Sequence, residues 1–363
     1  RRRHPWLVGS VEWDDSMTRR AVVWLSEKLE KPVLKVIEEE YNENGVGELL
    51  TAAGPAYQVN IRVFNQLQHT ITGWPGGKPE ADDSNRPERA QPHPKRVLIF
   101  SPEPHDAFVG MGGTIDRLVE QGHQVRLAVQ TSGNLRVSDV AAYKFASVVR
   151  EMAELIGGQG WEGQLSYASD IINQLEEKGE FGLDPARVRK LKGLILRGEA
   201  RDAARVCGVG DEALTFVDLP FYEAGRYRRF RLQDEDVTII RNLLTEYEPH
   251  QVYLTGDVAD PSSLQALCFR AFQQAIPESG GWLEDCRVWL YRGKEEPLAA
   301  HEINMAVPMS PDQLALKAES LRKFQSINSG ELETPDRNRN TAREYDRLGM
   351  AEYEAIEAFQ RWR

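Results

Sequence analysis

Three side chains that can bind a metal ion or move a proton lie within four residues of one another in the stretch SPEPHDAF. They are Glu103, His105 and Asp106, and they follow an apolar run of strand length, RVLIF, at residues 96–100. Two prolines restrict the backbone of this stretch. One interpretation is half of a metal site. The alternative is a capping loop, in which Asp106 accepts backbone hydrogen bonds near the start of the next helix and Glu103 is solvated.

The glycines in GMGGTI, at residues 110–115, raise the question of a nucleotide site. The dinucleotide fingerprint G-x-G-x-x-G requires a third glycine where this chain has Ile115. We therefore do not expect nicotinamide or flavin binding. The glycines are expected instead to allow a close approach of the helix to a loop.

Short apolar runs alternate with amphipathic stretches from residue 96 onward. The runs RVLIF, QVRLAV, LTFVDL, QVYLT and RVWLY have strand length, and stretches of helical period begin near residues 111, 140, 184, 234 and 262. This alternation predicts a Rossmann-like α/β fold, with a mostly parallel sheet covered by helices on both faces. Because ligands of such sheets bind at the carboxyl ends of the strands, we expect the chemistry in the loops after these runs.

The sequence divides into three consecutive segments. Residues 1–72 show helical periodicity and predict a small helical region. Residues 73–95 are rich in proline and glycine, which is typical of a linker. Residues 96–363 form the predicted α/β domain. The N-terminus begins in mid-pattern, and we interpret it as the edge of a longer polypeptide.

The composition is that of an ordinary globular protein of 363 residues, with 41% hydrophobic and 28% charged residues. The formal net charge of −11 argues against nucleic acid or an anionic membrane surface as a partner. Three scattered cysteines are too few for a disulfide framework, so a reducing cytoplasm is the expected compartment. Neither a membrane-spanning run nor a signal peptide is predicted.

Several motifs resemble those of a known family. The stretch SPEPHDAFVGMGGTIDRLVEQGHQV is similar to the signature of the PIG-L, or LmbE-like, N-acetylglucosaminyl deacetylases, whose loop reads P-H-P-D-D-E/D and is followed by a G-H-x-V turn. The resemblance continues through TSGN at 131–134, RGEAR at 197–201 and GDVADP at 256–261, and it covers nearly all of 96–363. Residues 1–95 resemble the connecting region of a bacterial two-module protein, whose N-terminal module is similar to glucosamine-6-phosphate deaminase.

The resemblance implies zinc-assisted amide hydrolysis, with two histidines and an aspartate on the metal and a second aspartate as general base. In this chain Glu103 stands at the first histidine ligand and His105 at the base, and only Asp106 matches a ligand. Gln265 stands at the third ligand, and Ser262 stands at a histidine that stabilises the oxyanion or protonates the leaving amine. Zinc is therefore not expected to bind as it does in the family.

The substituted residues could still hold a weakly bound divalent cation, because Glu103, Asp106 and Gln265 offer hard oxygen ligands. His105 is then the candidate general base, since an unperturbed imidazole is mostly neutral near pH 7. The alternatives are an active hydrolase with a remodelled site, a weakly catalytic or non-catalytic domain that binds an amino sugar or supports a deaminase-like module, and a structural module that forms a homo-oligomer. We favour the second.

The resemblance also implies a sugar pocket near the retained motifs. Arginines at strand ends suit phosphate or sugar hydroxyls, although surface ion pairs would explain them equally well. The predicted substrate-binding residues are Asn134, Arg197, Glu199, Arg201, Arg292 and Ser262.

Overall fold

The computed structural model describes residues 13–80, 92–158, 160–179, 182–224, 230–276, 285–327, 332 and 337–362. These pack as two compact units. The first unit comprises Arg1–Gly73, Glu296–Pro311 and Asp336–Arg361, and the second comprises Trp74–Glu295, Asp312–Pro335 and Trp362–Arg363. Residues 81–91 of the predicted linker lie outside the described residues.

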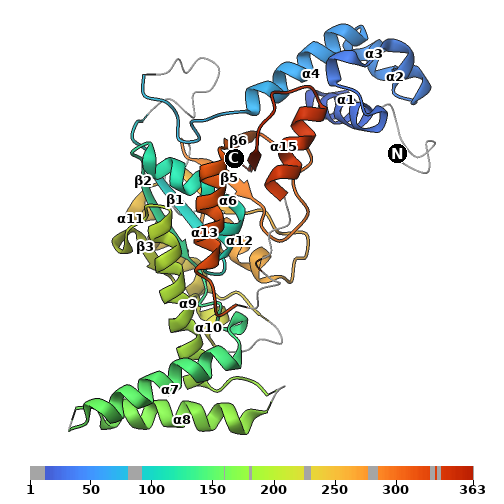
Figure 1. Ribbon diagram of the computed structural model, residues 1–363. Helices are drawn as coiled ribbons and strands as arrows, with labels where there is room; N and C mark the ends of the chain where they lie inside the picture. Colours follow the sequence, from blue (N-terminus) through green and yellow to red (C-terminus); the bar gives the residue numbers. More distant parts are fainter. Residues whose placement is uncertain are drawn as a thin grey trace. The chain divides into compact units, whose positions relative to one another are not determined.

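A parallel sheet forms the centre of the second unit. Its strands are β1 (Arg96–Ser101), β2 (Gln124–Val129), β3 (Leu214–Phe216), β4 (Gln251–Thr255) and β5 (Arg287–Tyr291). They lie in the order β3-β2-β1-β4-β5, and every neighbouring pair is parallel. Figure 1 labels β1, β2, β3 and β5 of this sheet. The predicted mostly parallel α/β fold is confirmed. Because the strand order reverses between β1 and β4, a crevice is expected at the carboxyl ends of these two strands.

Helices cover this sheet on both faces. On one face, buried side chains of α11 and α12 pack against Leu98, Val252 and Leu290 of the strands. Tyr291 follows Leu290 and points to the other face, where α6 lies against it. The helices of the unit are α6 (Asp106–Glu120), α7 (Asp139–Ile156), α8 (Glu162–Lys178), α9 (Ala186–Val206), α10 (Pro220–Glu223), α11 (Asp234–Tyr247), α12 (Leu264–Ala275) and α13 (Pro311–Arg322). Short 3-10 helices span Asn134–Arg136 and Asp211–Ala213.

Glycine allows α6 to approach the sheet closely. A Cβ atom at Gly110 would lie only 2.2 Å from Cδ2 of Tyr291, so a larger residue would displace the ring. The hydroxyl of Tyr291 in turn donates to the carbonyl oxygen of Phe100, 2.7 Å away. The close approach predicted from the glycines therefore occurs, against a strand side chain instead of a loop.

The first unit combines segments that are far apart in the sequence. Its helices are α1 (Asp15–Leu29), α2 (Glu38–Glu43), α3 (Gly47–Ala53), α4 (Ala56–Thr70) and α15 (Arg337–Arg347), with a 3-10 helix at Val33–Lys35 and the antiparallel strands β6 (Met305–Met309) and β7 (Ala355–Arg361). Val22 and Val63 share one core with Ile303 and Tyr345. Packing thus divides the chain differently from the three consecutive segments expected from the sequence, because late segments supply part of the core around the N-terminal helices.

Candidate functional site

The loop after β1 places Glu103, His105 and Asp106 together at the switch point of the sheet. All three are buried, and each offers one ligand atom within 4.8 Å of the others. The Glu103 backbone N–H donates to Asp106 Oδ2 at 3.0 Å, so Asp106 also satisfies a donor of its own loop. The three side chains lie close together, as half of a metal site would require. Asp106 also accepts a backbone hydrogen bond, as in a capping loop.

Two cationic side chains bind the Glu103 carboxylate. Arg136 donates from Nε to Oε1 at 2.8 Å and from its terminal nitrogen to Oε2 at 3.0 Å, a bidentate arrangement. Lys294 Nζ lies 2.5 Å from Oε2. Burial alone would raise the pKa of Glu103, but the charge of Lys294 and the contacts of Arg136 lower it to about 2. Glu103 is thus an ionised carboxylate held by an arginine and a lysine.

Lys294 and Gln265 reach the second carboxylate as well. Lys294 Nζ lies 3.5 Å from Asp106 Oδ1, and Gln265 Nε2 donates to Asp106 Oδ2 at 3.1 Å. Burial would lower the pKa of Lys294, but the charges of Asp106 and Glu103 raise it above its ordinary value. Gln265 lies in the first turn of α12, and the group that faces the carboxylates is its amide nitrogen, whereas the expected metal ligand was its amide oxygen.

His105 borders this cluster. Its Nε2 lies 3.5 Å from Asp106 Oδ1, and its ring packs against Phe324 with the ring centres 6.0 Å apart. Its Nδ1 is buried and has no hydrogen-bond partner among the described residues. The imidazole thus lies beside the Asp106 carboxylate, and its role as general base stays a prediction.

Asp257, after β4, fixes the loop that carries Lys294. Its carboxylate accepts backbone N–H groups from three successive residues, Gly293 at 2.8 Å and Lys294 and Glu295 at 3.0 Å. Its own N–H donates to Thr255 Oγ1 at 3.1 Å. This carboxylate holds the backbone of Lys294 in position beside the β1 loop.

The chemistry of the cluster does not fit a resident zinc ion. Zinc sites in proteins rely on several imidazole or thiolate donors, and this cluster offers one imidazole. Both oxygens of Glu103 already accept hydrogen bonds from cations, and Lys294 Nζ lies within reach of both carboxylates. A divalent cation bound between Glu103 and Asp106 would have to displace the ammonium group of Lys294 and would meet its charge.

The loop after β2 joins this cluster to a second place of interest. Thr131 Oγ1 donates to the carbonyl oxygen of Pro102 at 2.7 Å, which ties the β2 loop to the β1 loop. Gly133 has a φ of 64° in the left-handed region, and a Cβ atom there would lie 2.7 Å from Pro104. Ser132 directly precedes this glycine and Arg136 follows it by three residues, and the two side chains contact different partners. Arg136 binds Glu103, and Ser132 lines a pocket.

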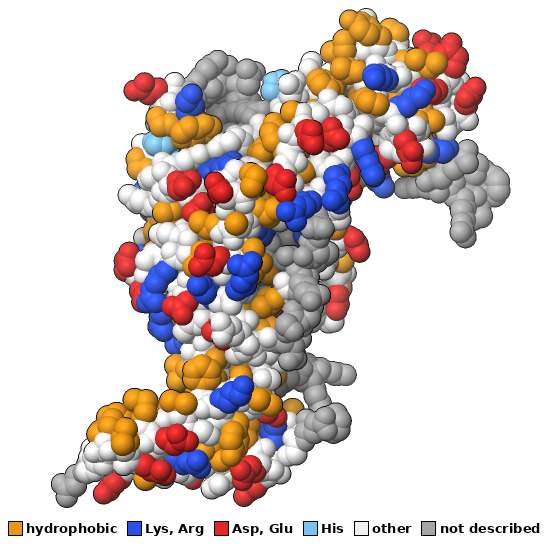
Figure 2. Space-filling model, in the orientation of Figure 1, with side chains coloured by type: hydrophobic (Ala, Val, Ile, Leu, Met, Phe, Trp, Pro, Cys, Tyr) orange, Lys and Arg blue, Asp and Glu red, His pale blue; other side chains and the backbone are white. Residues whose placement is uncertain are grey.

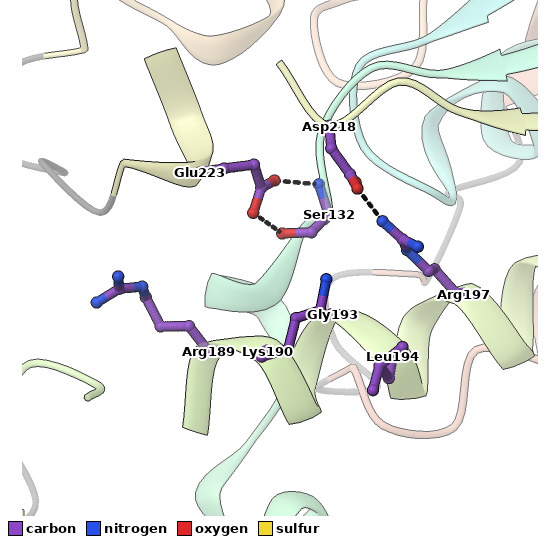
Figure 3. Close-up of a pocket in the computed structure, with 8 residues that line it drawn as sticks. All are labelled: Ser132, Arg189, Lys190, Gly193, Leu194, Arg197, Asp218 and Glu223. Carbon is purple, nitrogen blue, oxygen red and sulfur yellow. Dashed lines mark hydrogen bonds and ion pairs between the residues drawn. The ribbon is translucent and has the colours of Figure 1, made fainter. Parts of the chain in front are cut away.

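That pocket lies between α9, the loop after β3 and α10 (Figure 3). Glu223 accepts from the Ser132 N–H at 2.9 Å and from its hydroxyl at 3.1 Å, and Arg197 forms an ion pair with Asp218. Burial raises the pKa of the Glu223 carboxyl. Asp218 has a φ of 53°, a conformation that costs free energy in a non-glycine residue. The pocket is lined by Ser132, Arg189, Lys190, Gly193, Leu194, Arg197, Asp218 and Glu223.

Of the predicted substrate-binding residues, Arg197 lines this pocket and Asn134 supports it, donating from Nδ2 to Ser132 Oγ at 2.8 Å. Glu199 accepts from the N–H and hydroxyl of Ser326 at 2.9 and 2.8 Å. Arg201 stacks over the ring of Phe216. Ser262 is exposed and donates to Asp260. Arg292 is partly buried and directly follows β5. The structure thus places the six residues in several environments.

Arg136, Lys294 and Asp257 are the site residues that sequence reasoning missed. Each follows the end of a parallel strand, β2, β5 and β4 respectively, at the edge where chemistry was expected. Lys294 stands two residues after Arg292, which was singled out.

The fold and site define a Rossmann-like α/β protein with a charged cluster at the switch point of its sheet. Residues 98–263 match the profile of the PIG-L family, described as GlcNAc-PI de-N-acetylase, and this part of the chain is a PIG-L family domain. The chain is also 45% identical, over 98% of its length, to a glucosamine-6-phosphate deaminase-like protein of Bacteroides thetaiotaomicron, and it spans 56% of that protein.

Solved structures with a similar fold are more distant. The N,N'-diacetylchitobiose deacetylase of Pyrococcus horikoshii is 17% identical, with a TM-score of 0.47 over 74% of this chain and 83% of that one. The 4-carboxy-2-hydroxymuconate hydratase of Pseudomonas putida KT2440 is 15% identical, with a TM-score of 0.46 over 74% and 96%. Similarities this distant carry no argument about activity. None of the described helices is long and apolar enough to span a membrane.

Proposed function

We propose that the PIG-L domain of this chain binds an amino sugar and lacks the zinc-dependent deacetylase activity of its family. The observation that carries the proposal is the Lys294 ammonium group, 2.5 Å from Glu103 and 3.5 Å from Asp106. A positive charge at that place balances the two carboxylates without a metal ion. Catalysis by metal-bound water would need that place for the metal.

The pocket of Figure 3 is the proposed sugar site. Its two carboxylates, Asp218 and Glu223, suit the ammonium and hydroxyl groups of an amino sugar, and Arg189 and Lys190 suit a phosphate group. Arg197 pairs with Asp218, so a ligand would compete for a carboxylate that is already oriented. We therefore propose a 6-phosphorylated amino sugar as the preferred ligand.

Calorimetric titration with glucosamine, N-acetylglucosamine and their 6-phosphates tests this site. Glucosamine 6-phosphate should bind most tightly, and Arg189→Met should weaken its binding about tenfold, the loss of one charge-assisted contact. Arg187→Met is the matched control, because Arg187 lies on the same helix but pairs with Asp170. If none of the four sugars binds at millimolar concentration, the amino-sugar proposal is wrong.

Metal content tests the other half of the proposal. Protein purified from zinc-supplemented medium should carry well under one equivalent of zinc. The alternative, an active hydrolase with a remodelled site, rests on the closeness of Glu103, His105 and Asp106. It predicts acetate release from an N-acetylglucosamine derivative with Mg²⁺, Mn²⁺ or Zn²⁺, and such release would overturn the non-catalytic proposal.

The name of the Bacteroides relative supports a further part of the proposal, that the domain serves a deaminase-like module. The three cysteines are buried and free, which supports a reducing cytoplasmic setting.

A further inference from the structure

The helix α7 carries its large apolar side chains on the side that faces solvent. Its buried face consists of Ala142, Ala146 and Ala153, and the first two pack with Ile171 and Leu175 of α8. From residue 145 to its end, α7 exposes the apolar side chains of Phe145, Val148, Val149, Met152, Leu155 and Ile156, by 49%, 55%, 39%, 50%, 87% and 51%. A helix packed only against α8 would show the reverse arrangement, with large residues inside and small or polar ones outside.

The exposed side chains form one continuous stripe. Phe145, Val148, Met152 and Leu155 recur at intervals of three, four and three residues, the spacing that pairs one helix with another. Figure 2 shows hydrophobic side chains gathered at this end of the second unit, where α7 and α8 lie side by side in Figure 1. The stripe occupies residues 145–156 of the 18-residue helix and is about 18 Å long.

Charges beside the stripe indicate which partner fits it. Lys144 and Glu151 are exposed and lie seven residues apart on the same flank of the stripe. When two such helices pack antiparallel about a two-fold axis, the same flanks of both copies meet. Lys144 of one copy then approaches Glu151 of the other, and the reverse pair forms by symmetry. In a parallel packing, Lys144 of one copy would lie level with Lys144 of the other along the helix axis, so Lys144 and Glu151 would not meet.

A lipid surface suits the stripe less well. Helices that lie in a membrane interface are rich in lysine and arginine on their polar face, which attract anionic headgroups. On α7 the acidic residues Asp139, Glu151 and Glu154 outnumber the basic residues Lys144 and Arg150. In a dimer, by contrast, the basic side chains of one α7 can pair with the acidic side chains of the other.

We infer that the α7 stripe is an interface between two copies of this chain, which pack α7 against α7 antiparallel around Val148. Each α7–α8 hairpin then contributes two helices to a four-helix arrangement. The large apolar residues of α7 become its core, and the alanines remain the contact within each hairpin.

Sedimentation of the 363-residue chain tests the association. It should show twice the monomer mass, and Phe145→Glu with Met152→Glu should give a monomer that keeps the helical circular dichroism of the wild type. Leu183→Glu is the matched control, because Leu183 is 71% exposed but lies outside α7, and this variant should remain a dimer. A wild-type monomer across a micromolar concentration series, or a dimer unaffected by the double substitution, overturns the inference.

Cysteine cross-linking tests the direction of packing without relying on the double variant. The three native cysteines are buried and free, so an introduced cysteine is the reactive one. Val148→Cys should give a covalent dimer on oxidation. Leu155→Cys should not, because antiparallel packing separates the two copies of residue 155 by about 14 residues, or about 21 Å, and a disulfide spans at most about 7 Å between Cα atoms. Equal cross-linking of both variants would overturn antiparallel packing.

Charge exchange gives the third test. Lys144→Glu should weaken the dimer, and Lys144→Glu with Glu151→Lys should restore it, since the pairs re-form with reversed sign. A monomeric wild type that binds phosphatidylcholine vesicles would assign the stripe to lipid and overturn the inference.

Discussion

On folding, the Glu103 carboxylate loses its contact with water and gains ion pairs with Arg136 and Lys294. The net effect of these ion pairs on the free energy of unfolding can be measured. Glu103→Gln keeps the shape of the side chain but leaves Arg136 and Lys294 without their carboxylate. Removal of one partner of a buried ion pair costs about 3–5 kcal/mol. We expect the lower end, about 3 kcal/mol by the same measure, because both cationic side chains remain about one third exposed. Urea denaturation of wild type and variant measures the loss.

Glu120→Gln is the matched control, because Glu120 is exposed at the end of α6. It should change the free energy of unfolding by no more than about 0.5 kcal/mol. The pH dependence gives an independent check. The pKa of Glu103 is lowered from 4.5 to about 2, so the carboxylate stabilises the fold above the unfolded-state pKa and loses this effect as the pH falls toward 2. The difference in the free energy of unfolding between wild type and Glu103→Gln should become smaller as the pH falls over that range. A constant gap would contradict the ion pair.

Restoring the family's residues should not by itself restore tight zinc binding. The fourfold change Glu103→His, His105→Asp, Ser262→His and Gln265→His supplies the missing groups but leaves the ammonium of Lys294. A unit charge about 4 Å from another costs about 4 kcal/mol at an effective dielectric constant of about 20. The lysine can swing partly away, so we expect its further replacement, Lys294→Ala, to tighten zinc binding about tenfold or more.

Competition with a chelator measures the zinc affinity of the fourfold variant and that of the same variant with Lys294→Ala added. Lys31→Ala in the fourfold background is the control, because Lys31 pairs with Glu40 in the first unit and its replacement also removes one positive charge. Equal affinities with and without Lys294 would show that its ammonium does not compete with the metal. Failure of both variants to bind zinc would place the cause in the backbone of the strand ends.

Among the elements, the turn after β5 depends on Asp257 of the turn after β4. Asp257→Ala removes the acceptor of three backbone N–H groups, so the amides of Gly293, Lys294 and Glu295 should exchange with solvent faster. The free energy of unfolding should fall by about 1.5–3 kcal/mol, the range for hydrogen bonds to a charged group. Hydrogen exchange read by mass spectrometry locates the effect.

Asp260→Ala is the control from the same turn, because the Asp260 carboxylate accepts from the N–H and the hydroxyl of Ser262, two residues away. It should leave exchange at residues 293–295 unchanged. Unchanged exchange in Asp257→Ala would mean that other contacts hold Lys294.

Sequence patterns predicted the strands of the parallel sheet almost to the residue, because buried parallel strands are continuous apolar runs. The run LTFVDL was expected to be one strand, but β3 ends at Phe216 and the chain turns at Asp218. The helix α8 was missed, since it buries only Ala168, Ile171, Ile172 and Leu175 and its remaining residues are mostly polar. Strand β7 was missed as well, because Glu357 and Gln360 interrupt its apolar pattern.

The candidate site was predictable in its location but not in its charge balance. Strand ends and the family resemblance identified Glu103, His105, Asp106 and Gln265, and the structure brings them together. The two cations could not be assigned from spacing, because Arg136 and Lys294 come from other loops and a sequence of 28% charged residues offers many candidates. Pairing of distant charges is a property of the folded chain.

Over the whole molecule, the first compact unit depends on residues from three parts of the chain. Arg19 of α1 donates to the carbonyl oxygens of Ala300 and Ile303, at 3.0 and 2.6 Å. Thr70 at the end of α4 shares a 2.8 Å hydrogen bond with Tyr345. The N-terminal helices therefore complete a core with the segments around residues 300 and 345.

A chain that begins at residue 96 should lose this unit. Without α1 and α4, buried residues such as Ile303 and Tyr345 lose the partners that cover them, and exposed apolar area costs about 25 cal/mol per Å². We expect residues 96–363 alone to bind a hydrophobic dye and to melt earlier than the full chain. Arg19→Met tests the same contacts by a single substitution and should lower the melting temperature, whereas Arg20→Met, at an exposed neighbour, should not. If residues 96–363 fold with the stability of the whole chain, the N-terminal helices are a separate region, as the sequence boundaries at 72 and 96 would have it.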